Sequence, residues 1–193
     1  MKKILIKLSF FLLIFFPTNS EIKILPIIEG NFDAKIKLIV FESLTCSHCA
    51  KFHENIYPEL KEKYIDTGLA SIEFKSFPLD IAALNASKVA HCKNDGKSEI
   101  LHFLFNNQNK WIKGNNIEEL NSNLKELVNN KKFGIDFNKC IDNKKIEDYV
   151  LEDRIEGVKK FKINATPTII INDKKFDKPL TFKNLKKFLE KLI

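Results

Sequence analysis

Arginine is nearly absent from this 193-residue chain, because Arg154 is the single arginine among 32 basic residues. Recognition of phosphates and base edges favours the bidentate guanidinium group, so we do not expect a nucleic-acid partner. The formal net charge of +7 comes from lysines that are mixed with acidic residues along the whole chain. We interpret these charges as solvated faces.

Long apolar runs are scarce as well. Residues 8–16 form an apolar run that follows a lysine-rich start and ends at Pro17. This run is shorter than the roughly 18–20 apolar residues that span a bilayer, so we interpret it as a secretory signal, with a retained membrane anchor as the alternative. The small side chain of Ser20 favours cleavage after it. We therefore expect residues 1–20 to be the signal peptide of an exported, periplasmic protein.

No internal repeat and no Gly/Pro/Ser-rich linker divides the rest of the chain. Residues 36–41 are β-branched and mostly apolar, which predicts a strand buried on both faces. Apolar residues at helical spacing follow over 49–60, where Pro58 predicts a kink or an early end of the helix. Apolar and polar residues alternate over 70–77, which predicts a second strand.

Helical periodicity replaces the strand pattern from about residue 79 to residue 161. The segments that carry it are 100–105, 117–128 and 146–161. Asn115 and Asn116 are candidate N-caps for the second of them. After this block, residues 168–176 predict a strand hairpin, and residues 180–193 predict a closing helix.

The predicted order of elements is strand, helix, strand, helical block, hairpin and helix. A β-α-β start with a late β-β-α finish is the thioredoxin plan. We therefore predict an α/β protein with a thioredoxin fold and an inserted helical domain. Residues 21–80 and 160–193 form the thioredoxin-like domain, and residues 81–159 form the insertion.

Four cysteines lie beyond the predicted signal peptide: Cys46, Cys49, Cys92 and Cys140. An even number in an exported chain suggests two pairs. The segment Cys46-Ser47-His48-Cys49 falls at the start of a predicted helix, where free backbone N–H groups and the helix dipole stabilise a thiolate. His48 adds a second positive group. We expect Cys46 to be the exchanging sulfur and Cys49 its more buried partner.

A Cys-x-x-Cys pair also occurs as half of a zinc knuckle. The other two cysteines are too far apart in the sequence to form the second half, so a zinc site would need His53 or His91. Ala50 stands where covalent haem attachment requires a histidine. We therefore expect no metal and no cofactor other than the redox-active Cys46–Cys49 disulfide.

Two motifs resemble a known family. Residues 30–41 followed by Cys46-Ser47-His48-Cys49 resemble the DsbA family of periplasmic thiol–disulfide oxidoreductases, and Ala165-Thr166-Pro167-Thr168-Ile169 resembles its cis-proline loop. The resemblance implies a cis Thr166–Pro167 peptide that faces the cysteines and pairs with a substrate chain. The Thr166 hydroxyl would then reach the Cys46 thiolate. The alternative is an ordinary trans proline that opens the strand.

Ser47 departs from the Pro-His dipeptide that is commonest in this family, so the sequence does not predict the reduction potential of the cysteine pair. Cys92 and Cys140 are expected to form a structural disulfide, as in some DsbA-like insertions, with two buried free thiols as the alternative. Buried carboxylates relay protons in such folds, but Glu42 does not stand at the usual DsbA position, so we expect a surface or strand-end role for it. Three isolated histidines are assigned no role: His53, His91 and His102.

The sequence thus predicts an enzyme that introduces disulfide bonds into reduced, unfolded exported proteins through a mixed disulfide at Cys46. The resemblance implies reoxidation by a DsbB-type membrane quinone reductase. No added dimerisation segment is visible, so a monomer is expected. A disulfide isomerase or reductase is the close alternative. From a different class, the alternative is a periplasmic metal-binding module that uses Cys46, Cys49 and a histidine.

Overall fold

The computed structural model of the protein describes residues 23–193, so the predicted signal peptide at residues 1–20 lies outside the described residues. The strands are β1 (Ile27–Gly30), β2 (Ile36–Glu42), β3 (Ala70–Ser76), β4 (Thr168–Ile171) and β5 (Lys174–Lys175). The helices are α1 (Ser47–Asn55), α2 (Tyr57–Leu60), the π-helix η1 (Lys61–Ile65), α3 (Ile81–His91), α4 (Glu99–Asn106), α5 (Gln108–Trp111), α6 (Ile117–Lys131), α7 (Phe137–Asp142), α8 (Lys144–Phe161) and α9 (Phe182–Leu189).

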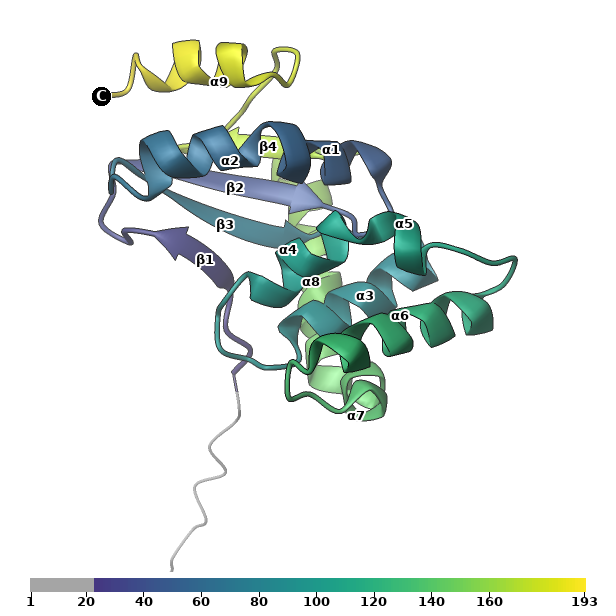
Figure 1. Ribbon diagram of the computed structural model, residues 1–193. Helices are drawn as coiled ribbons and strands as arrows, with labels where there is room; N and C mark the ends of the chain where they lie inside the picture. Colours follow the sequence, from purple (N-terminus) through teal and green to yellow (C-terminus); the bar gives the residue numbers. More distant parts are fainter. Residues whose placement is uncertain (1–22) are drawn as a thin grey trace, which may run out of the picture.

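The strands form one mixed sheet in the order β1-β3-β2-β4-β5 (Figure 1). The central strand β2 pairs in parallel with β3 and antiparallel with β4, and β4 and β5 form the predicted hairpin. The helices α1, α2 and α9 lie together on one side of the sheet, and α3 to α7 are gathered beside it (Figure 1). The predicted α/β thioredoxin fold with a helical insertion is confirmed.

The two faces of the sheet are covered by different helices. Leu38 and Val40 of β2 belong to the core that contains Phe52 of α1. Phe41 points to the other face and contacts α8, where a Cβ atom at Gly157 would lie 3.0 Å from its ring. Glycine at this position therefore lets α8 approach the sheet closely.

Strand β1 was not predicted from the sequence. It has only four residues, too few to show alternation, and it is held by antiparallel pairing with β3. Its last residue, Gly30, has a φ of +90°, and a Cβ atom there would lie 2.5 Å from the carbonyl oxygen of Ala70. Glycine is required where two backbones approach this closely.

The break predicted from Pro58 is confirmed. Helix α1 ends at Asn55, Ile56 has a φ of −118°, and Pro58 stands in the first turn of α2, where a missing N–H costs least. A second predicted boundary is less sharp. Residue 160, where we expected the insertion to end, falls within the last turn of α8, because this helix runs continuously from the helical block to the face of the sheet.

The helical block shares one buried core with the sheet. Trp111 is fully buried there, and its indole N–H donates to the carbonyl of Leu104 at 3.1 Å. Asn116 caps α6 as expected, since its side chain accepts from the backbone N–H of Glu119. A disulfide joins Cys92, at the end of α3, to Cys140 of α7. Within residues 23–193, no helix has the length and apolar character needed to cross a membrane.

Replacing both Cys92 and Cys140 by alanine is expected to destabilise the fold. The disulfide closes a loop of 48 residues, which stabilises the folded state by roughly 4 kcal/mol in the chain-entropy model. The midpoint of thermal unfolding, followed by circular dichroism, should fall by roughly 10 °C, while Cys46 keeps its reactivity toward iodoacetamide. Equal midpoints for the two proteins would contradict a stabilising role for this disulfide.

Candidate active site

Cys46 occupies the N-cap position of α1, as the sequence predicted. Its backbone is extended, and its carbonyl oxygen accepts the first helical bonds from the N–H groups of Cys49 and Ala50, both at 3.1 Å. A turn between Ser43 and Cys46 leads the chain from β2 into the helix. Cys46 is half-buried and Cys49 is buried, and both are free thiols in this structure.

The two thiols have opposite acidities. A hydrogen bond from the Cys49 thiol is the largest cause that lowers the pKa of Cys46, to about 5, and backbone N–H groups of Cys49 and His48 add to it against the opposing effect of burial. Burial raises the pKa of Cys49, and its bond to Cys46 and the negative charge of Glu42 raise it further. The pair therefore holds one thiolate, at Cys46, and one thiol, at Cys49.

His48 lies on the exposed side of the motif. Its backbone N–H is among the groups that lower the pKa of Cys46. His48 therefore helps to lower the pKa of Cys46 through its backbone N–H, because N–H groups in the first turn of a helix lack helical partners. His48 also lines the groove described below.

The second motif lies against the first. The Thr166–Pro167 peptide is cis, and the carbonyl oxygen of Thr166 lies 3.4 Å from the sulfur of Cys46. The Thr166 side chain also lowers the pKa of Cys46, and its buried hydroxyl has no hydrogen-bond partner among the described N and O atoms. The hydroxyl is free to donate to a thiolate. Strand β4, paired with β2, brings these distant residues together.

A groove of about 420 Å³ runs along this site. It is lined in part by His48, Phe52, Ile56, Thr166, Pro167 and Leu180. Apolar side chains in the groove and the Thr166 carbonyl beside the reactive sulfur suit an extended polypeptide chain, which pairs through its main chain and places side chains in pockets.

Gln108 supports the motif from the helical block. Its side-chain amide donates to the carbonyl oxygen of Leu44 at 2.8 Å and to that of Cys46 at 3.1 Å. This contact was not predicted from the sequence, because an isolated glutamine carries no signal of a partner more than sixty residues away.

The expectation for Glu42 was half right. Glu42 is the last residue of β2, as the strand-end role requires, but a surface role is wrong because only 3% of its side chain is exposed. Its Oε2 lies 2.7 Å from Nε2 of His53 in α1, at hydrogen-bond distance, and His53 in turn contacts His102 of α4 at 3.0 Å. Two histidines that the sequence left without a role therefore join Glu42, whose charge acts on Cys49.

The remaining histidine, His91, is buried, and burial lowers its pKa to about 4. It stays without a role. Across the part of the chain that the structure describes, no group of three or more His, Cys, Asp or Glu side chains is arranged to hold a metal ion.

Comparisons with known proteins agree with this geometry. A family model described as thioredoxin matches residues 24–191. A protein of Rickettsia bellii named as a protein-disulfide oxidoreductase is 33% identical over 148 residues, which are 74% of this chain and 55% of that protein. The chain spans about half the length of the curated rickettsial relatives that it matches.

Two further relatives are covered more fully. Disulfide bond formation protein D of Bacillus anthracis is 30% identical, and the match covers 84% of this chain and 76% of that protein. The crystal structure of alpha-DsbA1 of Wolbachia pipientis superposes with a TM-score of 0.75 at 34% identity, covering 86% of this chain and 90% of that one. The chain belongs to the DsbA family of thioredoxin-fold proteins.

Proposed function

We propose that this chain is a dithiol oxidase that introduces disulfide bonds into reduced proteins. The observation that carries the proposal is the contrast between Cys46, whose pKa is lowered to about 5, and Cys49, whose pKa is raised. A stabilised Cys46 thiolate favours the reduced pair over the disulfide. The oxidised form is therefore a strong oxidant, which is the property needed to donate disulfides.

The reaction proceeds through a mixed disulfide. A substrate thiolate attacks the half-buried sulfur of Cys46, the Cys46–Cys49 bond breaks, and Cys49 leaves and takes up a proton. A second substrate thiolate then attacks the substrate sulfur of the mixed disulfide, and Cys46 departs as a thiolate. The low pKa of Cys46 makes it a good leaving group, and backbone N–H groups of His48 and Cys49 hold its negative charge.

The cis-proline loop at Thr166–Pro167 binds the substrate. The backbone of Thr166 and the neighbouring Pro167 line the groove beside Cys46, so an extended substrate segment would pair with the main chain of Thr166. Residues 21–80 and 160–193 supply this site, and residues 81–159 support it from one side. The substrates are unfolded, reduced proteins.

The second disulfide supports a location in an oxidising compartment. Structural disulfides such as Cys92–Cys140 are common in exported proteins and rare in reducing compartments, which supports export guided by residues 1–20 and activity in the periplasm. The pair at Cys46 would be reoxidised there by a DsbB-type membrane quinone reductase. The protein acts as a monomer without metal, with the Cys46–Cys49 disulfide as its redox group.

Oxidation of reduced, unfolded ribonuclease tests the activity. The disulfide form of the protein should restore ribonuclease activity rapidly, a Cys46→Ser variant should be inactive, and chelation of metals should leave the rate unchanged. Scrambled ribonuclease, offered in parallel, should be reactivated poorly. Rapid unscrambling with slow oxidation would instead assign the chain as an isomerase, and inactivity in both assays would end the oxidoreductase proposal.

The acidity of Cys46 provides a second prediction. Ultraviolet absorbance of the thiolate in the reduced protein should titrate with a midpoint near pH 5. Because this pKa is depressed on folding, the thiolate stabilises the reduced fold most above the unfolded-state pKa of about 8.5, and the gain is lost as the pH falls through 5. Thr166→Val removes the hydroxyl and should raise the midpoint. A midpoint near 8.5 in the unmodified protein would contradict the site as described.

A further inference from the structure

The ionisable residues that line the groove beside Cys46 are both basic. They are His48 and Lys51 of α1, which stand three residues apart and therefore lie on the same side of the helix. The other lining residues carry no charge, and they are Phe52, Asn55, Ile56, Thr166, Pro167 and Leu180. The groove is therefore mainly apolar, with basic groups along the edge that α1 forms.

Lys51 has no acidic partner within the part of the chain that the structure describes. Its side chain is exposed, and no carboxylate among residues 23–193 lies within 4.0 Å of its ammonium group. The acidic residue of α1, Glu54, lines a different pocket on another side of the helix. Glu59 of the neighbouring helix α2 is already paired with Lys63 at 3.1 Å. The charge of Lys51 is thus available to a bound chain.

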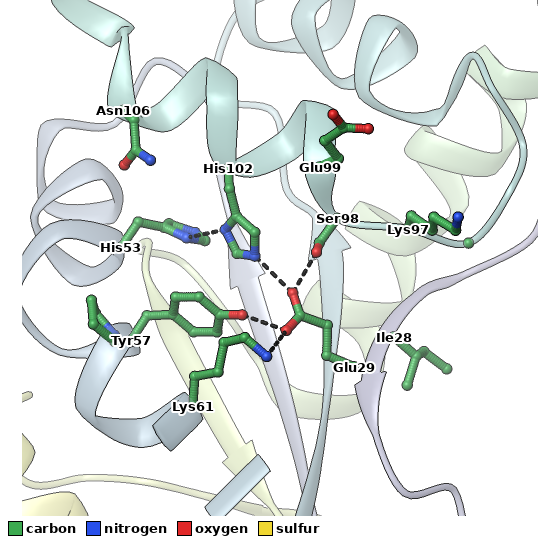
Figure 2. Close-up of a pocket in the computed structure, with 12 residues that line it drawn as sticks. Ile28, Glu29, His53, Tyr57, Lys61, Lys97, Ser98, Glu99, His102 and Asn106 are labelled. Carbon is green, nitrogen blue, oxygen red and sulfur yellow. Dashed lines mark hydrogen bonds and ion pairs between the residues drawn. The ribbon is translucent and has the colours of Figure 1, made fainter. Parts of the chain in front are cut away.

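A larger pocket nearby shows the opposite arrangement. This pocket of about 630 Å³ lies between β1, α2 and α4 and contains the carboxylate of Glu29. Four side chains of the protein contact this carboxylate, as the dashed lines of Figure 2 show: Tyr57, Lys61, Ser98 and His102. Glu29 needs no ligand to balance its charge, whereas only solvent or a bound chain can balance the charge of Lys51.

The position of Lys51 on α1 determines which substrate residue it meets. Lys51 stands five residues after Cys46, which is about 7.5 Å along a helix that rises about 1.5 Å per residue. An extended substrate chain advances about 3.3 Å per residue, so this distance corresponds to about two residues. Side chains two residues apart on an extended chain point to the same face. A substrate cysteine that reaches Cys46 therefore directs the side chain two residues away toward Lys51.

A carboxylate is the side chain that this place favours. An exposed ion pair with a lysine changes an equilibrium or rate by about twofold to fivefold. The partial positive charge at the start of α1 acts in the same direction, because a helix N-terminus attracts negative groups. A basic substrate side chain at the same place would be repelled by both.

We propose that the groove prefers substrate segments with an acidic side chain two residues from the reactive cysteine, and that Lys51 sets this preference. The preference rests on the proposed thiol–disulfide exchange, for which it names the class of substrate. Lys51 is a specificity residue and takes no part in the exchange of sulfur bonds. The apolar lining residues accept the rest of the segment.

Peptides with a single cysteine test the preference. Two series carry Glu, Gln or Lys either two residues before or two residues after the cysteine and are otherwise identical and uncharged. The disulfide form of the protein is mixed with each peptide in excess and quenched with acid at intervals, and mass spectrometry follows the loss of the Cys46–Cys49 disulfide. One peptide thiolate attacks Cys46, and Cys49 takes up a proton. A second peptide thiolate then attacks the bound peptide, which leaves as a peptide disulfide and frees the Cys46 thiolate.

The rate with the Glu peptide is divided by the rate with the Gln peptide for each protein. In at least one series this ratio should be about twofold to fivefold higher for the unmodified protein than for Lys51→Gln. Comparing the two proteins cancels the effect of the glutamate on the acidity of the peptide thiol. Lys51→Glu should reverse the order and react faster with the Lys peptide. The difference should shrink at about 0.5 M salt, because salt screens exposed charges.

Lys139→Gln is the matched control. It makes the same change in net charge at a lysine of α7 that is 85% exposed and does not line the groove. This variant should keep the ratio of the unmodified protein. Equal ratios for the unmodified protein and Lys51→Gln in both series, or the same loss in Lys139→Gln, would overturn the preference.

The two proposals fail in different ways. A disulfide form that no peptide reduces and that oxidises no ribonuclease would remove the proposed function itself. A disulfide form that every peptide reduces, with the same ratio in the unmodified protein and in Lys51→Gln, would remove only the preference for acidic segments.

Discussion

The stabilisation of a thiolate at the N-terminus of α1 is the interaction on which the rest of the site depends. Cys46 is the N-cap of that helix, and the thiol of Cys49, followed by the Thr166 side chain and the N–H groups of the first turn, lowers its pKa to about 5. The sheet positions Cys46, because β2 leads into the start of α1 and β4 brings Thr166 next to the sulfur of Cys46. The helical block contributes Gln108, which holds the carbonyl of the cap residue.

The two thiols differ in acidity because they differ in burial. Cys46 is the half-buried N-cap residue, whereas Cys49 lies inside the first turn of the helix and is buried against the core. Burial alone favours a protonated Cys49, and the nearby charge of Glu42 reinforces it. Glu42 is itself buried and bonded to His53, which contacts His102, so polar groups from three elements meet near this thiol.

Local patterns in the sequence were enough to predict the fold. The β-branched run of β2, the break at Pro58 and the cap at Asn116 each depend on neighbouring residues alone, and each is present. Strand β1 was missed because its four residues take their conformation from β3. Glu42, His53, His102 and Gln108 were missed for a related reason. Their partners lie on other elements, and single polar residues carry no periodicity that would reveal such contacts.

The reduction potential of the Cys46–Cys49 pair, measured against glutathione over a range of pH, shows whether a stabilised Cys46 thiolate governs the site. We expect a potential well above the roughly −270 mV of thioredoxin. We also expect a slope that changes near pH 5, from about 59 mV per pH unit below it to about 30 mV above it, because only Cys49 then takes up a proton on reduction. A thioredoxin-like potential with a single slope of about 59 mV up to pH 8 would contradict this role of the thiolate.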